Sequence, residues 1–180
     1  MFTHHSSSIN VEYLGMTQPL HTEMHKKVVA LLDEAYESRV NNLSKSIALT
    51  EEAKALCEKH DLISLKAQSL SKIALYNMIR GKHSLSLELS HEAIAIYKEL
   101  EDEKGLAEIN YSIAGIYYRT NNYHLGMVYL LDCLFTFRKY SDYHNVSRTL
   151  KSLGAIYDLL GDIENAKKSY EEAAQVAIKI

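Results

Sequence analysis

Residues 150–177 read LKSLGAIYDLLGDIENAKKSYEEAAQVA, and this stretch decides the fold. Its first half carries apolar residues such as Leu153 and Ile156 at helical spacing. Gly161 interrupts that pattern, and Ile163 begins a second amphipathic segment with alanines along one face. The stretch therefore predicts two helices joined by a tight turn.

The rest of the chain repeats this pattern with a period of 40 residues. Small residues recur at this spacing in three sets. The first set is Ala53, Ala93, Cys133 and Ala173, and the second is Ser46, Ser86, Gly126 and Ala166. The third set is Ala74, Ala114 and Gly154. A fourth register holds residues that tolerate a left-handed backbone, which are Asn41, Gly81, Asn121 and Gly161. Small residues let two helices approach closely, and one such pair cannot bury its apolar face alone, so the pairs must stack.

The last unit resembles a tetratricopeptide repeat. The matching residues are Leu150, Leu153, Gly154, Tyr157, Gly161, Ala166, Tyr170 and Ala173, with weaker matches in the two preceding units. The period of 40 departs from the family's usual period of about 34, and units of this length resemble those of bacterial regulatory proteins. The resemblance implies an all-α, right-handed solenoid of about four antiparallel helix pairs.

We expect two regions along the chain. Residues 1–22 form a polar N-terminal segment that is partly disordered, and residues 23–180 form the repeat domain. The units span about 27–61, 64–101, 104–141 and 144–180. Breaks between helices are expected near Asn41, Asp61, Gly81, Asp102, Asn121, Asp142 and Gly161. We attribute the long period to longer second helices and longer connections.

Composition excludes several classes of protein. The net charge is -3, and no cluster of Lys and Arg favours a nucleic acid partner. The apolar runs are too short to span a membrane, and the N-terminus does not resemble a secretory signal. Cys57 and Cys133 are far apart and occupy positions where small apolar residues pack. We therefore expect a cytoplasmic protein whose cysteines belong to the core.

No motif indicates catalysis. His21 and His25 lie on one face of a helix in HTEMH, but the glutamate of the zinc-protease motif would have to follow the first histidine directly, and Thr22 is there instead. A solvated helix start is the better interpretation. The glycines are too dispersed to cradle a phosphate. We expect no enzymatic activity, no cofactor and no metal.

The resemblance implies that first helices line a concave groove, and we place a partner site there in the third and fourth units. The groove residues are Tyr111, Tyr118, Arg119, Arg148, Lys151 and Asp158. Their tyrosines and cations favour an acidic or phosphorylated peptide or an acidic protein surface. In the alternative, the cations pair with Glu108 and Asp158 and the groove is neutral. Leu75, Gly115 and Ala155 replace the asparagines of the family's carboxylate clamp.

The expected function is a protein-binding or peptide-binding scaffold. Resemblance favours the N-terminal sensory or regulatory region of a larger bacterial signalling protein, for example a diguanylate cyclase or histidine kinase. The alternative is a free-standing adaptor that bridges two partners, and a small enzyme is a third hypothesis. We also expect a homodimer through the C-terminal helix, because the face with Val176, Ile178 and Ile180 has no following unit to cover it.

Overall fold

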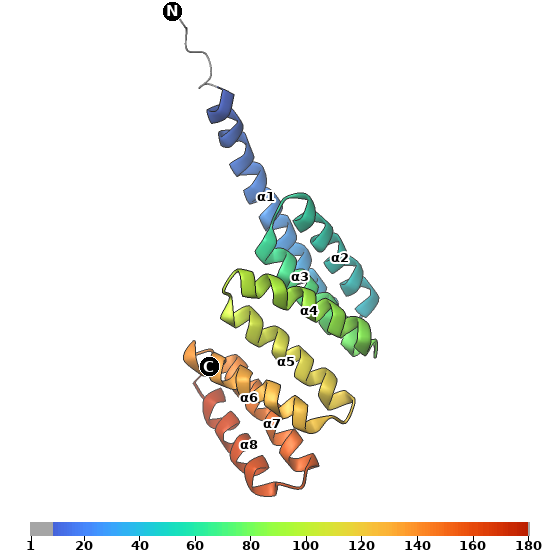
Figure 1. Ribbon diagram of the computed structural model, residues 1–180, viewed down its shortest axis with the longest axis vertical. Coiled ribbons are helices and arrows are strands. Elements are labelled where there is room, and N and C mark those ends of the chain that lie inside the picture. Colours follow the sequence, from blue (N-terminus) through green and yellow to red (C-terminus); the bar gives the residue numbers. More distant parts are fainter. Residues whose placement is uncertain (1–8, 180) are drawn as a thin grey trace, which may run out of the picture. The chain divides into compact units, whose positions relative to one another are not determined.

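The computed structural model describes residues 9–179, with side chains from Thr22 onward. This range is all-helical and contains no strand (Figure 1). Its helices are α1 (Ile9–Ser38), α2 (Leu43–Lys59), α3 (Ile63–Ile79), α4 (His83–Glu99), α5 (Glu103–Arg119), α6 (Tyr123–Lys139), α7 (Tyr143–Leu159) and α8 (Ile163–Ala177). The all-α prediction is confirmed. Helix α1 begins before the boundary expected at residue 22, and the disorder expected for residues 1–22 stays a prediction.

The helices from α2 to α7 are identical in length. Each has 17 residues, and three residues separate each of them from the next helix. Two such helices with their connections give the 40-residue period, and every predicted break falls at a turn. The expectation of longer connections is wrong, because all the turns from α2 onward are equally short. The extra length relative to the family's usual unit lies within the helices.

A left-handed residue ends most of these helices. Gly81 and Gly161 have φ of 78° and 79°, and Asn121 has φ of 60°, as their register predicts. Asn41 does not share this conformation, because the turn before α2 is built differently. The residue after each left-handed position donates its N–H to a carbonyl five residues back, as Asn122 does to Tyr117 at 2.8 Å. This bond caps free carbonyl groups at the helix end.

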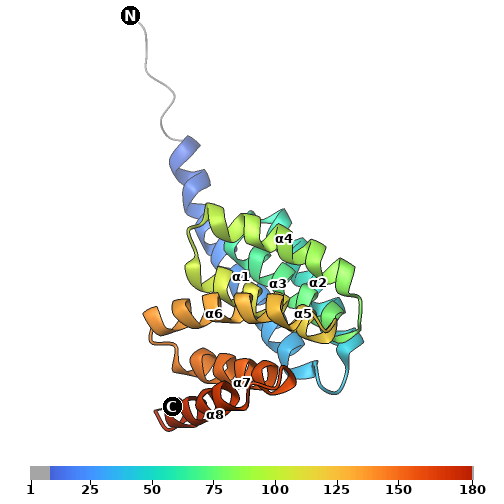
Figure 2. The same ribbon diagram turned by 60° about the horizontal axis from the view of Figure 1, so that its bottom comes forward.

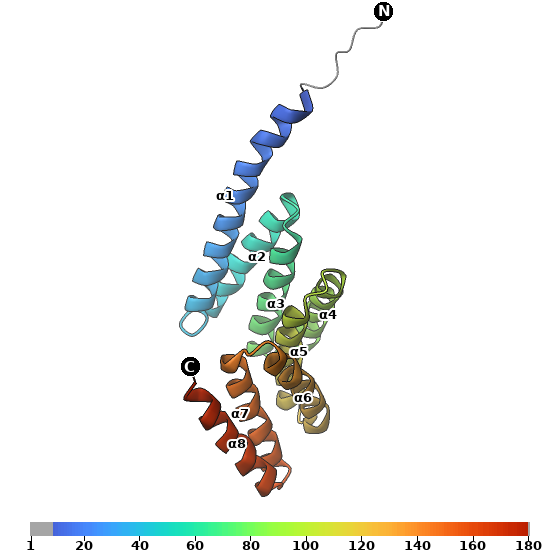
Figure 3. The same cartoon turned by 90° about the vertical axis from the view of Figure 1, so that its left-hand side faces the viewer.

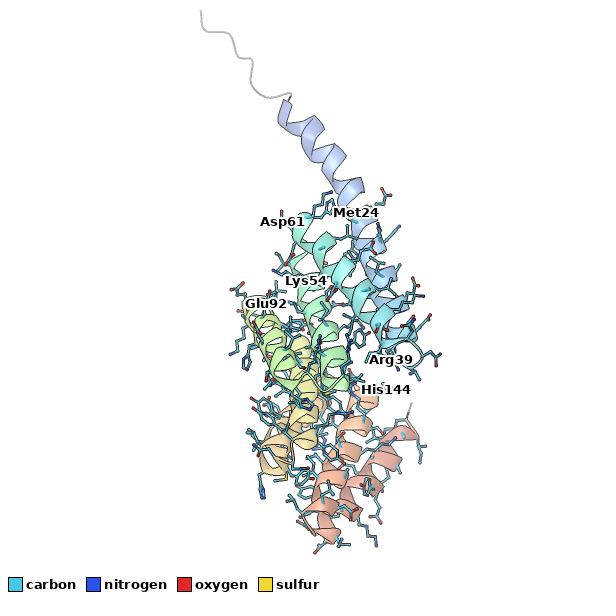
Figure 4. All side chains as sticks on the ribbon, turned by 90° about the vertical axis from the view of Figure 1, so that its right-hand side faces the viewer. Met24, Arg39, Lys54, Asp61, Glu92 and His144 are labelled. Carbon is cyan, nitrogen blue, oxygen red and sulfur yellow. The ribbon has the colours of Figure 1, made fainter. Side chains whose placement is uncertain are left out.

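The chain divides into two compact units, the first ending at Ser69 and the second spanning Leu70–Ile180. In the first unit α1 packs against α2, as Figure 3 shows, and the core includes Val28, Leu32 and Cys57. Its surface is polar and includes Lys54, labelled in Figure 4, which forms a salt bridge with Glu58 at 3.0 Å.

In the second unit the helices from α4 to α8 pack consecutively (Figure 2). The most extensive contacts join α5 to α6 and α7 to α8, as expected for antiparallel pairs. The core of this unit includes Leu130, Phe137, Leu150, Leu153 and Ile156. This packing positions the residues of α5 and α7 that form the candidate site.

The repeated small residues lie at close helix contacts. Ala93, Cys133 and Ala173 are all fully buried. Ser147 Oγ, on α7, donates a hydrogen bond to the Ala173 carbonyl of α8 at 3.0 Å. Cys133 Sγ, on α6, donates to the Ala107 carbonyl of α5 at 3.1 Å in the same way. A bond from a short side chain to a neighbouring backbone requires the two helices to be nearly in contact, so the small residues set the helix spacing.

The C-terminal helix does not present the apolar face that we expected. Val176 is buried in the core of the second unit, whereas Ile178 is 85% exposed and Ile180 lies outside the described residues. Positions two apart point to different sides of a helix, which is why these residues do not share a face. The outer surface of α8 instead carries charged residues such as Lys168 and Glu171.

Candidate functional site

A pocket of about 380 Å³ is lined mainly by residues of α5 and α7. Its lining residues are Met78, Tyr111, Ala114, Gly115, Tyr118, Arg119, Leu130, Ser152, Ala155 and Ile156. The helical spacing of Tyr111, Gly115 and Tyr118 brings them to one face of α5, and Ser152 and Ala155 do the same on α7. The pocket therefore has an apolar floor with a few polar groups, which is the usual character of a binding site.

The structure brings half of the expected site residues together in this pocket. Tyr111, Tyr118 and Arg119 all line it. Arg148 lies directly beside it, with its guanidinium carbon 4.1 Å from the centre of the Tyr111 ring. This arrangement is a cation–π contact, and it holds both side chains in place. Sequence alone does not indicate that these two residues touch.

The other two expected residues lie outside the pocket. Lys151 and Asp158 are exposed on α7 and do not belong to its lining. Lys151 follows Arg148 by three residues, so it lies on the same side of the helix one turn further along. It extends the positive surface beside the pocket, whereas Asp158 lies near the end of α7.

The cations of the site have no acidic partners in the part of the chain that the structure describes. No salt bridge joins Arg119, Arg148 or Lys151 to any carboxylate there. The alternative in which they pair with Glu108 and Asp158 is therefore not observed. Arg148 Nε is buried and has no hydrogen-bond partner. The site thus presents positive charge although the chain as a whole is negative.

A methionine from another helix forms part of the pocket floor. Met78 of α3 lines the pocket and reaches over Gly115. A Cβ added at Gly115 would lie 3.0 Å from the Met78 sulfur, so the methionine already fills that space. Sequence analysis also missed Leu130 and Ile156, which line the floor although their periodicity marks them only as core residues.

Polar contacts fix the rim. The hydroxyl groups of Tyr111 and Ser152 lie 2.9 Å apart, so a hydrogen bond joins α5 to α7 across the pocket. Tyr118 is 41% exposed, and its ring meets the Tyr123 ring edge-on at 5.9 Å between centres. Tyr111 is therefore held by a hydrogen bond, whereas Tyr118 exposes part of its ring to a ligand.

The cysteines belong to the core, as expected. Both are buried and reduced. Burial raises the pKa of the Cys133 thiol to about 12, and burial also raises the pKa of Cys57. Both therefore remain protonated at neutral pH, and a protonated thiol is a poor nucleophile and a poor metal ligand.

Among the described residues, no group of three His, Cys, Asp or Glu side chains lies in a metal-binding arrangement. No described helix has the length and apolar character needed to span a membrane. His25 is exposed on α1, whereas the side chain of His21 lies outside the described residues.

Residues 147–177, which cover almost all of α7 and α8, match the family model of the tetratricopeptide repeat. The resemblance of the last helix pair to this family is thereby confirmed. Such repeats are typically non-catalytic scaffolds that bind proteins or peptides. The crystal structure of BtubC (BKLC) from P. vanneervenii is similar at 16% identity and a TM-score of 0.44, covering 91% of each chain. No curated protein matched the chain.

Proposed function

We propose that this protein is a non-catalytic scaffold that binds an acidic peptide or acidic protein segment in the groove between α5 and α7. The observation that carries the proposal is the set of cations around an apolar pocket. Arg119 lines the pocket, and Arg148 and Lys151 lie beside it without carboxylate partners among the described residues. Charge without an internal partner at a concave apolar surface favours an acidic ligand.

The chemistry of the pocket indicates how such a peptide would bind. Its floor of Leu130, Ile156 and Met78 accepts one apolar side chain, which gains free energy by leaving water. Acidic residues of the same peptide would then lie against Arg119 and Lys151. The exposed ring of Tyr118 offers further contact area, as tyrosines at interfaces commonly do.

Two biological settings fit a scaffold of this kind. The favoured one is the N-terminal regulatory region of a larger bacterial signalling protein in the cytoplasm, which the resemblance to long-period arrays supports. The second is a free-standing adaptor with two partners. A binding partner encoded within the same polypeptide would distinguish the first setting from the second.

The test is a binding measurement with three matched peptides. The peptides share a central leucine and differ only in flanking residues, which are Glu, Gln or Lys. We expect the fluorescently labelled Glu peptide to bind most tightly, as measured by anisotropy. Combining Tyr118→Ala with Arg148→Ala should abolish that binding while the circular dichroism spectrum stays helical.

Arg148 is partly buried and contacts Tyr111, so its replacement affects stability as well as binding. A variant that changes only exposed charges separates the two effects. Arg119→Glu combined with Lys151→Glu changes only exposed side chains. This variant should lose affinity for the Glu peptide and gain affinity for the Lys peptide. The control is Lys26→Glu, an exposed position on α1 outside the site. Equal affinity for all three peptides, or no effect of the charge variant, would contradict the proposal.

A further inference from the structure

A second cavity, of about 420 Å³, is lined by residues of α4, α5 and α6. It shares no residue with the pocket lined by α5 and α7. Helix α5 packs against both α4 and α6 and contributes Leu106 and Asn110 to the lining. Lys98 comes from α4 and Asp132 from α6. We call this cavity the α4–α6 groove.

The repeat supplies an internal comparison for this groove. The residues 40 positions after Asn110 and Thr136, which both line the groove, are Leu150 and Val176. Leu150 is 3% exposed and Val176 is 8% exposed, and both belong to the core of the second unit. Asn110 and Thr136 are only half-buried. Polar side chains at positions that the next helix pair uses for its core indicate a role other than packing.

Two opposite charges also face the α4–α6 groove without meeting. Between α6 and α8, Arg138 and Glu172 form an ion pair. The residues 40 positions earlier are Lys98 and Asp132. Each is one bond shorter than its counterpart, and neither forms a salt bridge within the part of the chain that the structure describes. The Asp132 carboxylate accepts a long hydrogen bond of 3.4 Å from the Asn110 amide.

The other carboxylate of the groove is already matched. Glu103 accepts a hydrogen bond from Lys139 Nζ at 2.5 Å and a second one from the Tyr140 hydroxyl at 3.3 Å. The lining also includes apolar side chains such as Ile94 and Leu106. The groove therefore offers a ligand one cation, one anion and an apolar surface.

We propose that the α4–α6 groove binds a free amino acid with an aliphatic side chain. The carboxylate of this zwitterion pairs with Lys98, and its ammonium group donates hydrogen bonds to Asp132. The oxygen of the Asn110 amide can accept a further hydrogen bond from the ammonium group. The aliphatic side chain lies against Ile94 and Leu106 and gains free energy by leaving water.

The pattern of charge favours a zwitterion over a simple anion or cation. An anion would leave Asp132 unpaired, and a cation would leave Lys98 unpaired, whereas a zwitterion satisfies both. The cavity lies in the size range of small-molecule sites. Because no residue is shared with the α5–α7 pocket, this site is independent of the proposed peptide binding.

The test is an NMR titration of the isotopically labelled chain with L-leucine. We expect the amide signals of Ile94, Asn110 and Asp132 to shift, with little change at Tyr118. The affinity should lie in the millimolar range, because so small a ligand makes few contacts. No shift at high millimolar concentration would overturn the proposal.

Two analogues of leucine test its two charges separately. L-leucinamide lacks the carboxylate, and 4-methylpentanoate lacks the ammonium group. Each should bind at least about tenfold more weakly than leucine, because each leaves one charge of the groove unpaired. Equal affinity for leucine and both analogues would overturn the proposal.

Two variants assign these charges to residues. Asp132→Asn should weaken leucine binding at least about tenfold and leave 4-methylpentanoate unaffected, because that analogue lacks the group that Asp132 binds. Lys98→Gln should weaken leucine in the same way and leave leucinamide unaffected. Both residues are exposed, so the fold should tolerate these changes. The control is Glu88→Gln, an exposed carboxylate of α4 outside the lining. Unchanged leucine binding in Asp132→Asn or Lys98→Gln would overturn the assignment.

A last variant fills the groove without changing its charges. Asn110→Leu combined with Thr136→Val introduces the residue types that the next helix pair has at Leu150 and Val176. This variant should lose leucine binding while its circular dichroism spectrum stays helical. A folded variant that binds leucine as tightly as the parent would show that the groove is not the site.

Discussion

The helix pair α5–α6 and the helix pair α7–α8 share the same pattern of buried residues but differ in their exposed residues. Their buried positions correspond closely, because Ala114 and Gly154 occupy one close contact and Cys133 and Ala173 occupy another. Their exposed positions do not correspond. Phe135 on α6 stands where α8 has Gln175.

This difference separates the residues that build the repeat from the residues that give each pair its own role. Buried small residues fix the distance between helices, so their type is constrained. Exposed residues make no such contact and can vary without affecting the fold. Substitutions at buried positions should therefore change the stability of the protein, and substitutions at exposed positions should change its binding.

The largest expected effect contrasts two phenylalanines of α6. Phe137 is fully buried, whereas Phe135 is 72% exposed. Phe137→Ala should lower the free energy of unfolding by about 3–5 kcal/mol, because it removes buried surface and leaves a cavity. Phe135→Ala should change it by less than about 0.5 kcal/mol. Urea unfolding followed by circular dichroism measures both, and similar values for the two variants would contradict the assignment of buried and exposed faces.

The next effect tests the close approach of α7 and α8. Ala173→Leu should destabilise the protein by about 1–3 kcal/mol, because the Ser147 hydroxyl already contacts the backbone at Ala173 and leaves no space. Ala174→Leu, at the adjacent exposed position, is the matched control. An unchanged melting temperature for Ala173→Leu would show that the register of the last pair is wrong.

A smaller effect compares the starts of α7 and α6. Asp142 accepts a hydrogen bond from the Asn145 N–H at 3.2 Å, whereas Asn122 makes no side-chain cap. Asp142→Ala should therefore cost about 1 kcal/mol of stability. Asn122→Ala should cost clearly less in the same urea experiment. Equal losses at the two positions would mean that the cap at Asp142 contributes nothing.

The smallest effect is a pH dependence from the same residue. Partial burial raises the pKa of Asp142, but hydrogen bonds from Asn145 and the charge of Lys104 outweigh it and leave the pKa below its ordinary value. The stabilisation from this carboxylate is complete above the unfolded-state pKa of about 3.9 and is lost as the pH falls through the lower folded-state pKa. The stability of Asp142→Asn should therefore decline less steeply than that of the parent below about pH 4.

Most of the fold could be predicted from the sequence, because the period places a small residue or a turn former at each contact. Gly81 and Gly161 mark their turns directly. The turns at Glu101 and Ser141 also have positive φ, but their side chains give no such signal. Their conformation follows from the helices on either side, so the equal turn lengths could not be predicted locally.

The candidate site was predictable in part. Tyr111, Tyr118 and Arg119 share one helix face, and helical periodicity alone places them together. The contact of Arg148 with Tyr111 and the filling of the space at Gly115 by Met78 depend on helices from different repeats. The inward position of Val176 was also missed, because its spacing was interpreted without the facing helix. Contacts between repeats were thus the part that periodicity did not supply.

One measurement tests most directly whether the pocket lined by α5 and α7 receives the acidic ligand. The backbone amide signals of the isotopically labelled protein would be followed by NMR during titration with the Glu peptide. We predict that the shifted signals cluster at Gly115, Tyr118, Arg119, Ser152 and Ala155, with little change at Val128 and Phe135. Shifts confined to the outer face of α6, or no shifts at saturating peptide, would contradict it.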